Sequence, residues 1–157
     1  MQYEKINALL PELKSTLSAE GWSDAAAAIR TTDTFSKLAT RSVQLGEHQV
    51  TINGITKGSG MIAPNMATML GYVFTDANIS QSALQQLLSE SNEASFNSIT
   101  VDSDSSTNDT VLAFATRQSK HEEITDITAA QAQAFVAAFR AVMIELAQLI
   151  VRDGEGA

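Results

Sequence analysis

The segment "KLATRSVQLGEHQVTINGIT", residues 37–56, predicts the centre of the fold. Two runs rich in β-branched residues meet at Gly46, a pattern typical of an antiparallel hairpin. Two short apolar runs, "MLGYVFTD" at 69–76 and "NDTVLAFAT" at 108–116, are typical of further strands, the first of them buried. The sequence therefore predicts a β-sheet that contains a hairpin.

Helical patterns flank these strands. A first amphipathic pattern begins near Ile6 and is expected to stop at Gly21, and a short helix is expected from Ser23. A third helix is expected to begin at Ser80 or Ser82. Thr128 and Gln131 have the spacing of a capping box, which would open the most amphipathic helix. Its apolar face comprises Phe135, Phe139, Val142, Met143, Leu146 and Leu149.

Length and pattern together predict the fold class. A chain of 157 residues suits a single domain, 1–157, with a substantial core. Long helices combined with hairpin-type strands favour an α/β (α+β) domain in which helices are layered on a sheet.

Composition narrows the function classes. The net charge of −8 argues against non-specific nucleic-acid binding, and the absence of cysteine excludes disulfides and thiolate zinc sites. No apolar run reaches the length of a membrane span, and the N-terminus lacks a signal-peptide pattern, so we expect a cytoplasmic protein without membrane partners. His48 and His121 are expected at the surface, and no metal site is predicted.

The stretch "KGSGMIAPNMATMLGYVFTDA", residues 57–77, carries the candidate chemistry. Gly58 and Gly60 allow a close backbone approach, Lys57 adds a cation, and Thr68 stands in an apolar context. A threonine hydroxyl needs a base, yet no histidine is near in sequence. One solution makes threonine a new N-terminus, whose α-amine has a pKa of about 7.7–8 and serves as the base. That solution requires cleavage between Ala67 and Thr68.

Four blocks together resemble the bifunctional ornithine acetyltransferase family, also called glutamate N-acetyltransferase. They are "AAAAIRTTDTFSK", the 57–77 stretch, "SFNSITVDSDSSTND" and "RDGEGA", in the family's order along the chain. The resemblance implies a precursor that cuts itself between alanine and threonine, giving an α chain that would include residues 1–67 and a β chain that would begin with residues 68–157. It also implies a layered α/β fold.

The resemblance implies roles for individual residues. Thr68 matches the autocleavage residue and nucleophile, which carries acetyl from N-acetylornithine to glutamate in arginine biosynthesis. Lys57 matches a lysine that binds the substrate carboxylate, and Glu155 an acid suited to the amine end of ornithine. No cofactor is implied, although some members use acetyl-CoA as a co-substrate.

The chain departs from the family pattern in places. Arg30 stands where methionine is usual, and Ser36 replaces proline. Ser103 replaces a glycine, so the family's turn geometry at this position is not assured. The chain also resembles only the central section of a longer enzyme. The upstream part would supply the Thr-Gly oxyanion hole, and the downstream part would complete the pocket.

Three function classes follow. The first is the acetyltransferase, expected as a homo-oligomer. The second is a self-cleaving amidohydrolase or aminopeptidase with the same N-terminal nucleophile. The third is a non-catalytic fragment that oligomerises. The absence of flanking segments predicts an intact Ala67–Thr68 bond in this chain, and an exposed apolar face covered by a second copy.

Overall fold

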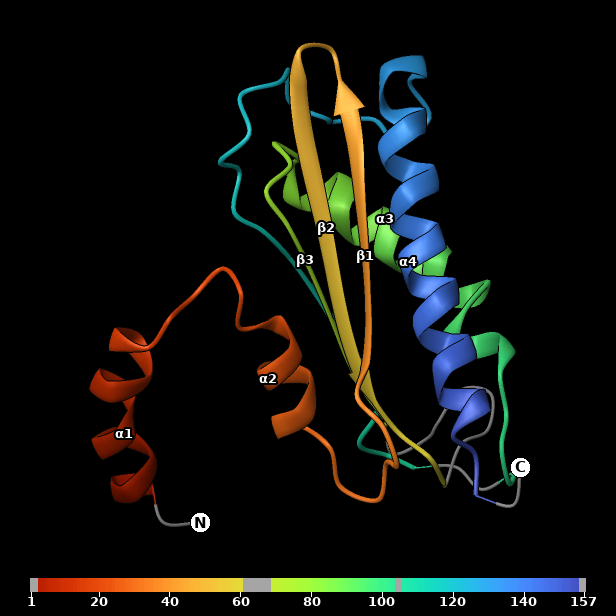
Figure 1. Cartoon of the computed structure of the whole chain (residues 1–157). Helices are drawn as coiled ribbons and strands as arrows, with labels where there is room; N and C mark the ends of the chain where they lie inside the picture. The colour runs from red at the N-terminus through yellow and green to blue at the C-terminus, as the bar shows by residue number, and fades with distance from the viewer. Residues whose placement is uncertain (1–2, 61–68, 104–105, 156–157) are drawn as a thin grey trace.

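The computed structural model describes residues 3–60, 69–103 and 106–155, and its centre is a four-stranded mixed sheet (Figure 1). The strand order is β1-β2-β3-β4, with β1–β2 and β2–β3 antiparallel and β3–β4 parallel. The strands are β1 (Lys37–Leu45), β2 (His48–Lys57), β3 (Leu70–Thr75) and β4 (Thr110–Ala115). The helices are α1 (Tyr3–Ser15), α2 (Trp22–Ala28), α3 (Gln81–Glu93) and α4 (Gln133–Arg152), with the 3-10 turns η1 (Phe96–Ser98) and η2 (Ala130–Ala132).

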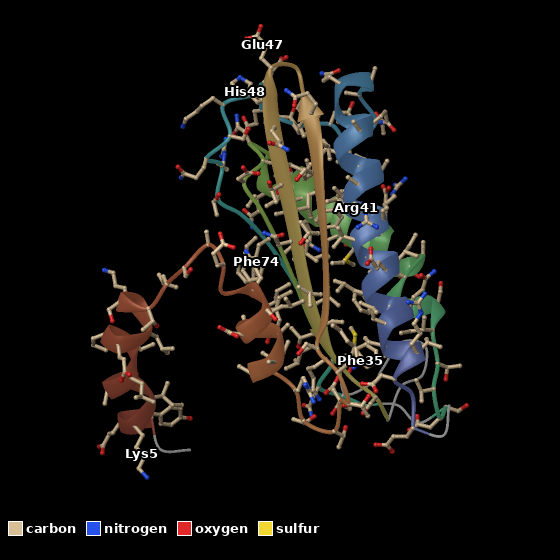
Figure 2. All side chains as sticks on the ribbon, in the orientation of Figure 1. Lys5, Phe35, Arg41, Glu47, His48 and Phe74 are labelled. Carbon is tan, nitrogen blue, oxygen red and sulfur yellow. The ribbon has the colours of Figure 1, made fainter. Side chains whose placement is uncertain are left out.

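The hairpin predicted around Gly46 is confirmed. Leu45 pairs with His48, so the turn consists of Gly46 and Glu47. Gly46 has a φ of 61°, the left-handed conformation that such tight turns require and that glycine adopts without strain. Figure 2 shows Glu47 and His48 at this tip, at the opposite end of the hairpin from Phe35.

One face of the sheet packs against α4. Gly54 in β2 lies so close to this helix that a Cβ atom would be 2.6 Å from the Leu146 Cδ1 atom. The buried side of α4 packs in the core with Val50 and Ile52 of β2 and Val73 of β3. Its buried residues are Phe135, Val136, Phe139, Val142, Met143, Leu146, Ala147 and Ile150.

The helix at Ala130–Arg152, formed by η2 and α4, is also long and apolar enough to cross a membrane by length and composition. The expectation that no apolar run reaches this length was wrong. The feature is weak evidence for a membrane segment, because the core helix of a globular fold passes the same test and α4 buries one face against the sheet.

The opposite face of the sheet is covered in part by α2. The Trp22 ring lies 5.2 Å from that of Phe74, which stacks at 5.1 Å on Phe114 of the parallel neighbour β4. On β4 the cover of this face is incomplete, with Leu112 42% and Phe114 45% exposed. An exposed apolar face therefore exists as expected, while its burial by a second copy stays a prediction.

Helix α1 stands apart from the sheet in Figure 1. None of its residues is buried, including the apolar residues Ile6, Leu9, Leu10 and Leu13 that gave the helical pattern. The helix ends at Ser15, before the predicted stop at Gly21. The pattern therefore predicted the helix correctly, although its apolar face has no partner in the described part of the chain.

Helix α3 begins where the sequence placed it. The Ser80 hydroxyl accepts a hydrogen bond from the Ala83 N–H at 3.3 Å, which caps the first turn. The capping box predicted at Thr128 and Gln131 was wrong. Thr128 instead donates from its N–H and its hydroxyl to Asp126, at 2.8 and 2.7 Å, and α4 begins after η2 at Gln133.

Two other expectations concern single residues. His48 is exposed as predicted, but the prediction of a surface His121 was wrong. His121 is buried: its Nε2 accepts from the Asn78 N–H at 2.9 Å, and its Nδ1 lies 2.6 Å from the Glu122 carbonyl oxygen. The doubt about Ser103 was justified, since its φ of 65° is the left-handed conformation that a glycine would adopt more easily.

We predict that Gly54→Ala destabilises the fold, because the added methyl group would meet Leu146 and Val142 of α4 at 2.6 and 2.8 Å. Overpacking of this kind costs about 1–3 kcal/mol in the free energy of unfolding, which urea denaturation measures. Gly21→Ala is the control, because its Cβ would lie 3.4 Å from the Ser18 carbonyl oxygen. Equal stability of the two variants would contradict the close packing of β2 and α4.

Candidate functional site

The candidate site lies where β2 ends, at the end of the sheet marked by Phe35 in Figure 2. Lys57 is the last residue of β2 and pairs with Leu70 at the start of β3. Gly54 and Thr56 belong to the face of the sheet that packs against α4. Strand side chains alternate between faces, so Lys57 points to the opposite face. Lys57 is only 6% exposed, and its ammonium forms no hydrogen bond or ion pair with another residue of the described ranges.

Glu155 approaches the same strand end from the other end of the sequence. Its N–H donates to the Ser59 carbonyl oxygen at 2.8 Å. Its carboxylate lies against Gly60, where a Cβ atom would be 3.0 Å from the Glu155 Cδ atom. The structure therefore brings the segments that carry Lys57 and Glu155 together, although the two side chains are not ion-paired with each other.

A buried charge triad, formed by Lys37, Asp33 and Asp153, is hydrogen-bonded to the Gly58 N–H, next to Lys57 in the sequence. The Lys37 Nζ atom is 2.7 Å from Asp33 Oδ1 and 2.5 Å from Asp153 Oδ2, and the three side chains are at most 3% exposed. The Phe35 ring covers the ammonium at 4.8 Å. A lysine is almost never fully buried without such partners, so the triad fixes three segments around one cation.

Each carboxylate of the triad also accepts backbone hydrogen bonds. Asp33 accepts from the Gly58 N–H at 2.6 Å and from the Thr31 N–H at 3.2 Å. Asp153 accepts from the Thr34 N–H at 2.9 Å and from the Thr34 hydroxyl. The triad therefore joins the 31–34 loop, the end of β2 and the end of α4.

These contacts set the protonation of the triad. Burial alone would raise the pKa of Asp33, but hydrogen bonds from Gly58, Lys37 and Thr31 outweigh it and lower the pKa from 3.8 to about 2. Burial also opposes ionisation of Asp153, whose pKa is nevertheless lowered by Lys37 and Thr34. Both acids are therefore ionised at neutral pH, opposite a buried cation.

The chain beside the predicted nucleophile is held by a side chain. The Met69 N–H donates to Asp109 Oδ1 at 2.8 Å, and Met69 is buried. Ala67 and Thr68, the predicted cleavage site and nucleophile, lie outside the described residues. Met69 immediately follows Thr68 in the sequence and precedes Leu70, the pairing partner of Lys57.

Sequence reasoning missed Asp33, Lys37, Asp153 and Asp109. A signal for Lys37 was available, because strand alternation puts it on the same face as Ala39 and Leu45, where a cation needs acidic partners. The departure Arg30 also contributes here, donating to the Asp33 and Thr34 carbonyl oxygens at 3.0 and 3.2 Å. The described residues include no group of three or more His, Cys, Asp or Glu placed to hold a metal ion.

The fold and this site define a mixed α/β domain in which the 31–34 loop, the end of β2 and the end of α4 meet at one end of a sheet. The ArgJ family model matches residues 1–157, and the chain belongs to the ArgJ family. It is 53% identical over 156 residues to the arginine biosynthesis bifunctional protein ArgJ of Nitrobacter winogradskyi. It is also 53% identical over 157 residues to the protein of the same name from Ruegeria pomeroyi.

A solved structure supports the fold. The crystal structure of the arginine biosynthesis bifunctional protein argJ from Bacillus halodurans matches with a TM-score of 0.55 and 43% identity, covering 57% of this chain and 42% of that one. The alignments cover 98% and 100% of this chain but 37% of the Nitrobacter and Ruegeria proteins. The chain thus spans little more than a third of the curated relatives it matches.

We predict that stability falls in acid through Asp33. Its pKa is lower in the folded than in the unfolded chain, so its stabilising contribution is complete above pH of about 3.8 and is lost as the pH falls toward about 2. The amount is about 2 kcal/mol in the free energy of unfolding.

Urea denaturation between about pH 5 and about pH 2 measures this loss, and Asp33→Asn should flatten the decline. Asp24→Asn, which removes an exposed carboxylate on α2, is the control. The same pH dependence in the parent and in Asp33→Asn would show that Asp33 does not contribute it.

Proposed function

We propose that this chain forms the central part of an acetyltransferase of arginine biosynthesis, which moves acetyl from N-acetylornithine to glutamate through an acetyl ester of Thr68. Membership of the ArgJ family supports the pathway, because the relatives named above are arginine biosynthesis bifunctional proteins. Because those relatives are longer than this chain, the activity proposed is that of the intact polypeptide that contains it.

One observation carries the proposal: a buried cation, unpaired among the described residues, and an acid lie on adjacent segments at the strand end that precedes residue 68. Lys57 and the Glu155 segment are linked through Ser59 and Gly60. A buried ammonium without a partner in the described residues is costly unless a ligand supplies the negative charge. We infer that a substrate carboxylate pairs with Lys57, while Glu155 accepts from an amine.

The proposed first step is self-cleavage. The Thr68 hydroxyl oxygen attacks the Ala67 carbonyl carbon, and the Ala67–Thr68 peptide bond breaks as the Thr68 nitrogen takes up a proton and leaves as an amine. Water then hydrolyses the resulting ester, which gives an Ala67 carboxylate and regenerates the Thr68 hydroxyl. The hydrogen bond from Met69 to Asp109 would hold the backbone beside the reacting residue.

Acetyl transfer would then follow in two halves. The freed Thr68 amine, with a pKa of about 7.7–8, accepts the hydroxyl proton as the oxygen attacks the acetyl carbonyl of N-acetylornithine. Ornithine leaves with that proton, and the glutamate amine then attacks the acetyl ester. The bond from the acetyl carbon to the Thr68 oxygen breaks, a proton passes from the glutamate nitrogen to that oxygen, and N-acetylglutamate leaves. Donors to the oxyanion would come from outside the described residues, and each typically contributes a factor of about 10²–10³ in rate.

The proposal also covers the cofactor, the cellular compartment, the substrates and the oligomeric state. This chemistry needs no bound cofactor, and acetyl-CoA would enter as an alternative acetyl donor. We place the enzyme in the cytoplasm, where N-acetylornithine and glutamate would be its small-molecule partners. We also propose a homo-oligomer, in which a second copy covers the open face at Leu112 and Phe114.

We predict that Thr68→Ala in the intact polypeptide abolishes both self-cleavage and acetyl transfer, because the hydroxyl that forms both esters is absent. Intact mass spectrometry measures cleavage, and release of ornithine in the presence of glutamate measures transfer. Thr116→Ala, at an exposed threonine, is the control. Normal processing in Thr68→Ala would refute the assignment of Thr68 as the nucleophile. Release of acetate by the parent protein without formation of acetylglutamate would indicate a hydrolase.

We predict that Lys57→Ala raises the KM for glutamate about 10- to 100-fold while leaving self-cleavage intact, since a charge-assisted hydrogen bond contributes about 1.5–3 kcal/mol. Steady-state kinetics of the intact polypeptide at varied glutamate test this. Lys120→Ala removes an exposed lysine and is the matched control. An unchanged KM would remove Lys57 from the site.

A further inference from the structure

The segments that carry Lys57 and Glu155 are joined to the same buried ammonium. We infer that Lys37 is a positioning residue, which sets the Glu155 segment relative to Lys57 through Asp33 and Asp153 and so fixes the spacing of the two charges that bind substrate. This inference rests on the proposed function for the substrate, but the coupling of the two segments can be tested without it.

The first connection runs from Lys37 to Lys57. Asp33 Oδ1 accepts at once from the Lys37 ammonium at 2.7 Å and from the Gly58 N–H at 2.6 Å. Gly58 directly follows Lys57 and has a φ of 152°, a conformation that side chains disfavour. The direction in which the chain leaves β2 is therefore held by a hydrogen bond to the triad, one residue from Lys57.

The second connection runs from Lys37 to Glu155. Asp153 Oδ2 accepts from Lys37 at 2.5 Å, and the Asp153 N–H donates to Ile150, which anchors this residue to the last turn of α4. Glu155, two residues further, is tied to Ser59 by its own N–H. A Cβ atom on the intervening Gly154 would be 2.9 Å from Val101 Cγ1, so this backbone is closely packed.

The cation is what allows the two connections to meet. Without it, Asp33 and Asp153 would be two buried carboxylates that repel each other across the junction. A buried ion pair is seldom more stable than an apolar replacement, so stability alone does not explain a charge at this place. A rigid junction between two substrate-binding segments does explain it, because an ammonium directs hydrogen bonds to both acids at once.

Hydrogen exchange on the 157-residue chain tests the coupling. Asp153→Asn removes the charge that Lys37 holds and retains the side chain's shape, so the Glu155 amide should exchange at least about tenfold faster while core amides such as Val73 and Phe139 keep their rates. Glu145→Gln is the matched control, because it removes a carboxylate of α4 whose ion pair, with Arg41 of β1, is exposed. Unchanged exchange at Glu155 in Asp153→Asn would overturn the coupling.

Kinetics of the intact polypeptide test the consequence for substrate. In Asp153→Asn we expect the KM for both N-acetylornithine and glutamate to rise about tenfold with kcat changed less than about threefold, and in Glu145→Gln neither to change. A fall in kcat with KM unchanged would overturn the positioning role. If the parent transfers no acetyl to glutamate, the proposed function fails and the substrate part of the inference fails with it, while the exchange result still decides the coupling.

Discussion

The described structure depends at one end on a buried cation between two carboxylates. Lys37 begins β1, Asp33 lies in the loop before it, and Asp153 follows α4, so one ammonium connects the sheet to its covering helix. The cost of removing three charges from water is offset because each also forms further hydrogen bonds or a ring contact. This end of the sheet is therefore held by directional contacts, whereas its middle is held by apolar packing.

Elements that follow from local sequence pattern could be predicted, whereas contacts between residues far apart in the sequence could not. The hairpin at Gly46, strands β3 and β4, and helix α3 follow from local patterns, because period and turn chemistry act over a few residues. The start of α4 was misplaced, because Thr128 hydrogen-bonds to the Asp126 carboxylate and α4 begins only at Gln133, after η2. His121 was misjudged because its hydrogen bond comes from Asn78, a distant part of the chain.

The site divides in the same way. Lys57 and Glu155 were identified by resemblance, and the structure brings their segments together. The triad could not be read from the sequence, because Lys37 and Asp153 are 116 residues apart. Such a pairing depends on the way that α4 crosses β1 and β2, which local pattern does not specify. Lys37 itself was detectable as a charge on an inward strand face, which shows that the need for a partner was predictable although its identity was not.

The course of the backbone across the sheet has a consequence for any protein cut between residues 67 and 68. Asp33, Lys37 and the β1–β2 hairpin precede that point, whereas β3, α4 and Asp153 follow it. The edge-to-edge pairing of β2 with β3, the seat of α4 on β1 and β2, and the ion triad would all become contacts between two polypeptides. The two polypeptides would then share one hydrophobic core, and neither could bury its apolar residues without the other. Dissociation would require the shared core to open, so the two polypeptides would stay associated for as long as the domain is folded.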